Sequence, residues 1–148
     1  ANPLEADSEQ VVLLAEDEPT VRRIVTRILT NAGYRVIAAA DGAEAVELLR
    51  KHKEAVTVAM LDAVMPNLGG KDAYEQMQKL RPDLPVLFSS GYAADSLPQS
   101  LLERQGVAIL PKPYDPQSLL STLADLLSKV ARTTDARDAV HEPPTANH

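Results

Sequence analysis

The 148-residue sequence contains no cysteine, little aromatic character and no excess of basic residues. Without cysteine the chain can form neither a disulfide framework nor a thiolate metal site, which is typical of a reducing cytosol. The 15 Lys and Arg residues are outnumbered by 21 Asp and Glu and are scattered, so the basic patch of a nucleic-acid-binding protein is missing. No segment approaches the roughly 18 consecutive apolar residues of a membrane span. We therefore expect a cytoplasmic protein without direct contact with nucleic acid or membrane.

Two patterns alternate along the chain. Short apolar segments rich in β-branched residues have the length of strands, and the segments between them show the spacing of amphipathic helices. The expected strands are 11–15, 35–39, 56–61, 85–89 and 107–110, and the expected helices are 21–29, 42–52, 71–80, 96–105 and 116–131. This alternation predicts an α/β fold with one parallel sheet covered by helices on both faces, in the common strand order 2-1-3-4-5.

The two ends of the chain lack apolar periodicity. We expect an N-terminal linker over residues 1–9, one domain over 10–131 and a disordered C-terminal tail over 132–148. His141 lies two residues before the first of two consecutive prolines, which should deny it the helix that a phosphorylated histidine of a kinase needs. We interpret His141 as a solvated residue of the tail.

Polar side chains follow the expected strands at their carboxyl ends. Glu16 and Asp17 follow the first strand, Asp62 the third, Ser90 the fourth and Lys112 the fifth. Order 2-1-3-4-5 makes the first and third strands neighbours at the point where strand order reverses, which is where ligands bind in such sheets. The first acids alone could simply cap a helix, and a lone lysine is usually surface. Their gathering at one sheet edge favours a shared site.

The residue types at this edge permit a specific chemistry. Carboxylates without histidine or cysteine form a hard oxygen site suited to Mg²⁺. An aspartate can act as a nucleophile and become an aspartyl phosphate. Phosphoryl transfer also needs a cation and a hydroxyl or N–H group to hold the phosphoryl oxygens, and Lys112 and Ser90 could supply them. The residues thus predict Mg²⁺-dependent phosphorylation of Asp62.

Four motifs resemble those of the receiver domains of two-component response regulators. They are "EDE", "LDAVMPNLGG", "SSGYA" and "KPY", each after a different expected strand. The resemblance covers about residues 10–131 and implies a flavodoxin-like (βα)5 three-layer sandwich. A flavin-binding protein would share that topology, but the acidic "AEDEP" after the first strand would repel its phosphate.

The resemblance implies a role for each matching residue. Asp62 would be the phosphoacceptor, and Glu16 and Asp17 the acidic pair, with Asp17 a direct ligand of Mg²⁺. Asp62 would also be a ligand, and the backbone carbonyl of Val64 would supply a further protein oxygen. Two further residues complete the implied set: Ser90 as the switch hydroxyl, and Lys112 as the lysine that precedes a cis proline.

The resemblance also implies partners. The donor would be a histidine kinase or a histidine phosphotransfer domain, docking on Thr20, Val21 and Ile24 of the first helix and on the segment 112–114. We expect a monomer or a weak dimer. Phosphoryl transfer to its own aspartate and slow hydrolysis would be its only chemistry, so it is not expected to be an enzyme acting on other substrates.

Two features bear on the switch and on its lifetime. The family often has an aromatic residue three positions before the lysine, where this chain has Ile109, so a coupled tyrosine flip is not expected. We expect the loop 91–97 to move on phosphorylation. Val64 and Tyr92 flank the path of the hydrolytic water, and neither carries a carboxylate or amide to orient it, so slow hydrolysis is expected.

The segment "RPDLPVLFSSGYAAD" resembles receivers at the C-terminal end of hybrid sensor kinases. Other origins are open: a stand-alone single-domain regulator, a receiver whose output domain is missing, or a receiver-like scaffold that is not phosphorylated. The scaffold is disfavoured because every motif position is retained.

Overall fold

Five parallel strands form one sheet. They are β1 (Val11–Ala15), β2 (Arg35–Ala39), β3 (Val58–Asp62), β4 (Val86–Ser90) and β5 (Val107–Pro111). The computed structural model describes residues 10–91 and 97–141, with side chains through residue 129. The sheet order is β2-β1-β3-β4-β5, with every neighbouring pair parallel. The predicted flavodoxin-like fold class and strand order are confirmed.

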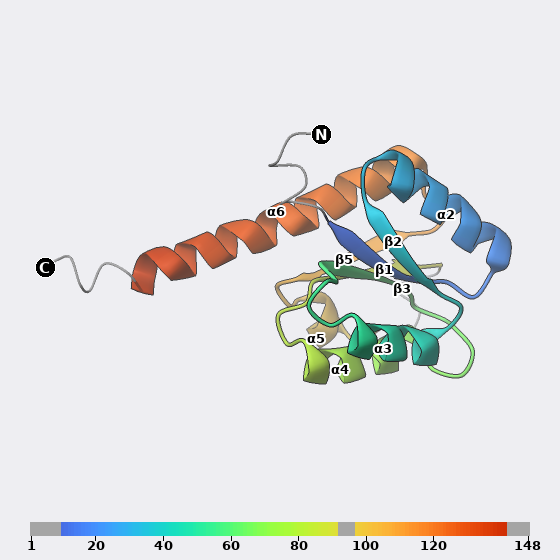
Figure 1. Cartoon of the computed structure of the whole chain (residues 1–148), viewed down its shortest axis with the longest axis horizontal. Helices are drawn as coiled ribbons and strands as arrows, with labels where there is room; N and C mark the ends of the chain where they lie inside the picture. The colour runs from blue at the N-terminus through green and yellow to red at the C-terminus, as the bar shows by residue number, and fades with distance from the viewer. Residues whose placement is uncertain (1–9, 92–96, 142–148) are drawn as a thin grey trace, which may run out of the picture.

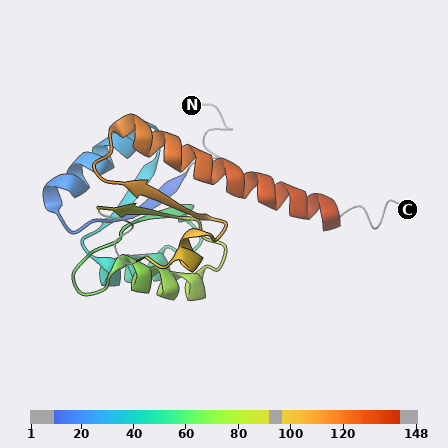
Figure 2. The same ribbon diagram turned by 180° about the vertical axis from the view of Figure 1, so that it is seen from behind.

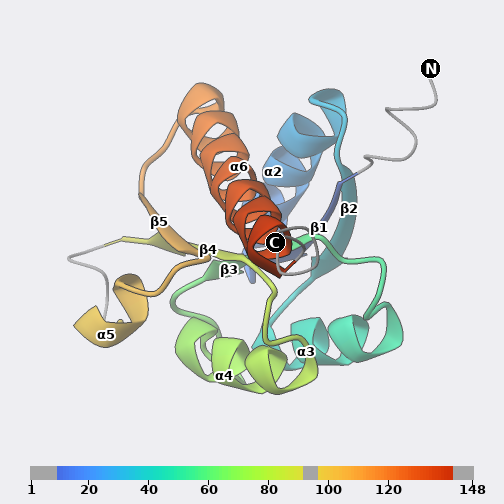
Figure 3. The same cartoon turned by 90° about the vertical axis from the view of Figure 1, so that its left-hand side faces the viewer.

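Helices cover both faces of the sheet and complete a three-layer sandwich (Figure 1, Figure 3). One face carries α2 (Pro19–Asn31) and α6 (Pro116–His141), and the other carries α3 (Gly42–Lys51), α4 (Gly70–Leu80) and α5 (Gln99–Leu102). None of the helices in the described residues combines the length and the hydropathy that crossing a bilayer requires.

Alternating side chains of the strands supply two separate cores. Leu61 and Phe88 point into the core under α3, α4 and α5, whereas Met60 and Leu87 point into the core under α2 and α6. All residues of β1, β3 and β4 are buried, because each of these strands has a neighbour on either side and a helix layer on either face. β2 and β5 are the edge strands and are partly exposed.

Helix α5 is shorter than the predicted helix 96–105. It spans only Gln99–Leu102 and begins directly after Pro98, whose backbone is extended. A proline has no N–H to donate and disfavours helical conformation in the residue before it, so the helix cannot begin earlier. Residues 92–96, which include most of the loop predicted to move, lie outside the described residues.

Helix α6 is longer than predicted, and the prediction of a disordered tail over residues 132–148 is wrong as far as His141. The helix continues from Pro116 to His141 and extends away from the sheet (Figure 1, Figure 2). No glycine or proline interrupts 117–141, and extending an existing helix costs far less than starting one. A proline disfavours helical conformation in the residue directly before it, and the residue directly before Pro143 is Glu142, not His141. Residues 1–9 and 142–148 lie outside the described residues.

Candidate functional site

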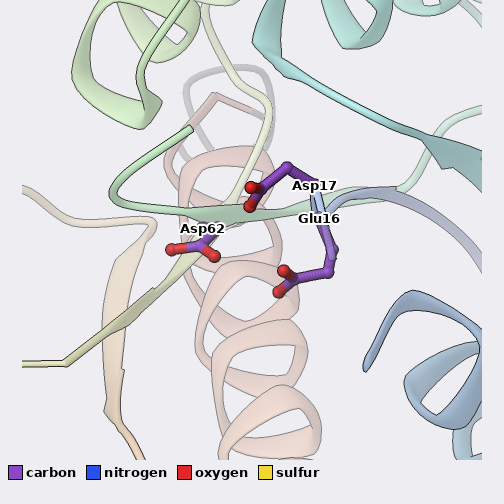
Figure 4. A group of neighbouring side chains, drawn as sticks. All are labelled: Glu16, Asp17 and Asp62. Carbon is purple, nitrogen blue, oxygen red and sulfur yellow. The ribbon is translucent and has the colours of Figure 1, made fainter. Parts of the chain in front are cut away.

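Three carboxylates meet at the carboxyl ends of β1 and β3 (Figure 4). Ala15 pairs with Leu61 in the sheet, so the residues that follow in each strand emerge side by side. One carboxylate oxygen each of Glu16, Asp17 and Asp62 lies within 4.8 Å of the others. Glu16 and Asp62 are buried, with 4% and 5% of their surface exposed, while Asp17 is exposed and leaves the cluster open to solvent. Strand order alone brings these three residues together.

The acids after β1 divide their roles. Glu18 is the N-cap of α2, and its side chain accepts a hydrogen bond from the Thr20 N–H (2.9 Å). Glu16 instead points into the site, where its Oε2 accepts a hydrogen bond from the Glu18 N–H (3.1 Å). The capping role considered for the whole acidic run therefore belongs to Glu18. Sequence reasoning missed Arg22, whose guanidinium donates to the Glu16 carbonyl (2.7 Å) and which no motif marks.

Asp62 has a partner on each carboxylate oxygen. Lys112 Nζ donates to Oδ2 at 2.9 Å, and the Val64 N–H donates to Oδ1 at 3.2 Å. Lys112 follows β5, and its own N–H donates to the Ser90 carbonyl (2.7 Å), which fixes the lysine beside the end of β4. Ser90 is buried at that end, with 3% of its surface exposed. The peptide bond from Lys112 to Pro113 is cis.

The site holds more negative than positive charge, because three carboxylates lie beside Lys112. Burial raises the pKa of Glu16 to about 7; the charges of Asp62 and Asp17 add to the rise, while the Glu18 N–H and Lys112 oppose it. Burial disfavours the charge of Lys112, but its hydrogen bond and proximity to Asp62 outweigh that effect and raise the pKa of Lys112. Lys112 is therefore the permanent cation of the site.

The site has the donors for a small hard cation. Three carboxylates provide oxygen ligands, two of them buried beside one exposed, and Mg²⁺ commonly takes one or two protein carboxylates and keeps several waters. Burial is the main cause of the raised pKa of Glu16 and repulsion from Asp62 and Asp17 adds to it; a divalent ion at this position would oppose both by stabilising the charged form. The donor set therefore fits Mg²⁺.

Apolar side chains are exposed on the loop after Asp62 and on α2. Val64 and Ile24 are exposed, with 64% and 53% of their surface accessible, and Val21 is half-buried. Tyr114 is half-buried against the core under α2 and α6, and burial raises its pKa to about 12, with a further contribution from the charges of Glu16 and Asp62. Part of the Tyr114 side chain therefore packs against the domain's own core, although it belongs to the segment 112–114 expected to dock the donor. Tyr92 lies outside the described residues.

Comparison with known proteins places these observations in a family. The family model "Response regulator receiver domain" matches residues 12–124. The "Sensor kinase CckA" of Brucella abortus (strain 2308) is 36% identical over 118 residues, which cover 80% of this chain and 12% of that protein. The "Response regulator receiver protein CpdR" of the same organism is 31% identical over 116 residues, covering 78% of this chain and 95% of that protein.

Solved structures agree with the sequence matches. The receiver domain from the hybrid histidine kinase CckA superposes with a TM-score of 0.67 at 28% identity, covering 79% of this chain and 98% of that one. A receiver domain protein from Methanospirillum hungatei JF-1 superposes with a TM-score of 0.72 at 27% identity, covering 85% and 99%. Some curated relatives are much longer: the chain spans 12% of CckA and 28% of the "Transcriptional regulatory protein GlrR" of Escherichia coli (strain K12).

Proposed function

The chain belongs to the response regulator receiver domain family, and from that premise we propose that Asp62 accepts a phosphoryl group from a phosphohistidine donor in a Mg²⁺-dependent reaction. The domain then works as a switch and returns slowly to the unphosphorylated state. The observation that carries the proposal is the position of Asp62: it lies in a cluster with Glu16 and Asp17 and is hydrogen-bonded to Lys112.

The chemistry of the transfer follows from these contacts. A carboxylate oxygen of Asp62 attacks phosphorus in line with the P–N bond of the donor, a P–O bond forms, and the imidazole nitrogen leaves with the electron pair. Lys112 already touches Asp62 at 2.9 Å and can remain beside the negative phosphoryl oxygens. The Val64 N–H, now 3.2 Å from Asp62 Oδ1, helps to orient the attacking carboxylate. Hydrolysis breaks this P–O bond again: water attacks phosphorus, Asp62 leaves as a carboxylate, and inorganic phosphate is released.

We assign Glu16, Asp17, Asp62 and the Val64 carbonyl to the metal site. Mg²⁺ bound there would neutralise charge that develops on the phosphoryl oxygens. Asp17 is exposed, so its carboxylate can bind the ion directly. Glu16 is buried, and we assign to it a contact with the ion through a water molecule bound to the metal. Glu16 must be deprotonated to contribute its charge, and its raised pKa means that bound cation and proton compete.

The switch and the slow return involve residues around the phosphoryl position. We assign to Ser90 the hydroxyl that holds a phosphoryl oxygen, and we expect the loop 91–97 to follow it. With Ile109 half-buried in edge strand β5, no aromatic ring accompanies the motion from that position. Val64 offers only an apolar side chain at the mouth of the site, which supports slow hydrolysis.

The donor would dock next to the site. Ile24 is an exposed apolar residue on α2, and Thr20 and Val21 lie one turn earlier on the same helix. A histidine kinase or a histidine phosphotransfer domain is the donor class that we propose.

The proposed origin of the segment is a hybrid sensor kinase, which the likeness to CckA supports. A single-domain regulator is the second candidate, supported by the likeness to CpdR, of which the match covers 95%. Reading the coding sequence upstream of Ala1 distinguishes the two.

Intact-mass measurement after incubation with acetyl phosphate tests the central proposal. Wild type should gain the mass of one phosphoryl group when Mg²⁺ is present and not in EDTA. Asp62→Asn should gain none, because an amide is a poor nucleophile for phosphorus. Asp125→Asn removes an exposed carboxylate of α6, so it is the matched control and should behave as wild type. Equal phosphorylation of Asp62→Asn and wild type would contradict the proposal.

A further inference from the structure

The loop of residues 63–69 connects Asp62 to α4 and lies against the start of α3. It carries Val64, whose N–H contacts the Asp62 carboxylate. The loop forms no helix or strand, and besides its own hydrogen bond from the Leu68 N–H to the Pro66 carbonyl it is held by contacts with its surroundings. The contacts with α3 come from residues that the reaction chemistry does not use.

Asp41 is the main polar contact between α3 and this loop. It is the N-cap of α3: its Oδ1 accepts a hydrogen bond from the Glu44 N–H at 2.8 Å. Its second oxygen, Oδ2, accepts a hydrogen bond from Asn67 Nδ2 at 2.6 Å, across 26 residues of sequence. Asn67 has a positive φ of 67°, a conformation in which asparagine is tolerated better than most residues. The two hydrogen bonds, from Glu44 first and Asn67 second, lower the pKa of Asp41, so the bond to Asn67 is charge-assisted.

Capping alone does not require an aspartate at this position. Serine and asparagine cap helices about as well, and each needs only one side-chain oxygen to do so. The second oxygen of Asp41 is directed to the loop rather than to the helix. The contact with Asn67 is thus an addition to the cap and can be removed separately from it.

Two glycines show how closely the loop is held. A Cβ atom on Gly42, the first residue of α3, would lie 2.1 Å from the Leu68 carbonyl oxygen. A Cβ atom on Gly70 would lie 2.6 Å from the Asp62 carbonyl oxygen, and the Gly70 N–H donates to the Ala63 carbonyl at 3.1 Å. The backbone of the loop therefore approaches α3 on one side and the end of β3 on the other with no room for a side chain.

We propose that Asp41, acting through Asn67, is a positioning residue of the acceptor site: it fixes the loop 63–69 so that Val64 is presented to Asp62 and to the metal. This inference rests on the proposed function for its effect on phosphorylation. Its structural part, the dependence of the loop on Asp41, can be measured without that function.

Two single variants and their combination remove the contact from either side. Asp41→Ser keeps a cap of α3 and loses the acceptor for Asn67. Asn67→Gly keeps a residue that accepts a positive φ and loses the amide. Each should weaken Mg²⁺ binding about three- to tenfold by calorimetry, below the 10–100-fold typical of groups that contact a metal ligand directly. Phosphorylation by acetyl phosphate at subsaturating Mg²⁺ should slow by a similar factor, and the double variant should be no worse than either single one.

Glu44→Ala is the matched control. Glu44 Oε1 accepts a hydrogen bond from the Ala40 N–H at 2.7 Å and so completes the cap of α3 without touching the loop. This variant should lose stability and keep the Mg²⁺ affinity of wild type. Unchanged affinity in both Asp41→Ser and Asn67→Gly would overturn the proposal, and so would an equal loss of affinity in Glu44→Ala.

Amide hydrogen exchange separates this proposal from the proposed function. Asp41→Ser and Asn67→Gly should speed exchange at Val64, Leu68 and Gly70 while the middle of α3 stays protected. If wild type neither binds Mg²⁺ nor becomes phosphorylated, the proposed function fails, and faster exchange in the variants would still support the positioning of the loop. Unchanged exchange in both variants would overturn the positioning itself.

Discussion

The two halves of the sheet edge that carries the site are built differently. Around the carboxylates that follow β1 and end β3, both strands are fully buried. Helix α3 there is a capped helix of 10 residues that packs against the loop 63–69. Around Ser90 and Lys112, α5 has only four residues and the first three residues of β5 are half-buried. Regions with fewer buried contacts open at lower free energy cost. We therefore expect the half around the carboxylates of β1 and β3 to be the more firmly held, and the half around α5 and β5 to open at lower free energy cost.

The largest effect on stability is expected when one buried leucine of each half is replaced by alanine. Leu49 of α3 is completely buried, and Leu101, with 6% exposed, is the buried residue of α5; both belong to the same core. Leu49→Ala should lower the free energy of unfolding by about 3–4 kcal/mol, and Leu101→Ala by about 1–2 kcal/mol, because the short helix can collapse into the space. Urea denaturation measures both.

Hydrogen exchange sharpens this first comparison. Leu101→Ala should accelerate exchange mainly around α5 and β5, whereas Leu49→Ala should accelerate it throughout the domain. The comparison between the two halves would be contradicted if Leu101→Ala lowered the free energy of unfolding as much as Leu49→Ala and accelerated exchange over as much of the domain.

The second prediction concerns the charge of the acidic half. The folded pKa of Glu16 is about 7 and its ordinary value is 4.5, so between these values the folded state binds the extra proton. Stability without metal should therefore fall as pH rises through this window and remain lower above it. Glu16→Gln removes the effect and should raise the free energy of unfolding in EDTA at pH 8 by about 1–3 kcal/mol, with no gain near pH 4.

The control for Glu16→Gln is Glu54→Gln, which neutralises an exposed carboxylate in the segment after α3. This variant should follow the pH dependence of wild type. If Glu16→Gln leaves the slope of stability against pH between 5 and 7 unchanged, the raised pKa of Glu16 is contradicted.

The smallest expected effect concerns a contact between the segment after α5 and α4. Arg104, just after α5, donates from Nη1 to the Tyr74 hydroxyl at 3.0 Å, and its guanidinium carbon lies 5.6 Å from the centre of that ring. Arg104→Met and Tyr74→Phe should each cost about 1 kcal/mol of stability, and a double-mutant cycle should give a coupling of about 0.5–1 kcal/mol. A coupling of zero would show that the contact does not restrain α5.

The sequence predicted most of the fold because local patterns were unambiguous. Short apolar runs mark β1 and β4, and the 3.6-residue spacing marks α2 and α3, with differences of a few residues at their ends. The prediction failed for α5 and α6. Pro98 prevents α5 from beginning earlier, and α6 continues beyond residue 131 although apolar periodicity ends there. Periodicity reports burial of a helix face, whereas an existing helix can continue without it.

The sequence by itself determined which chemical groups are available and at which strand ends they lie. Glu16, Asp17 and Asp62 had to meet once the strand order was 2-1-3-4-5, because parallel strands end at one edge. Only the tertiary structure decided that Glu18 caps α2 while Glu16 is buried with a raised pKa, and that Asp41 reaches Asn67 across 26 residues. The reason is physical: residue type and spacing fix local conformation, but burial and long-range contacts depend on how the layers pack.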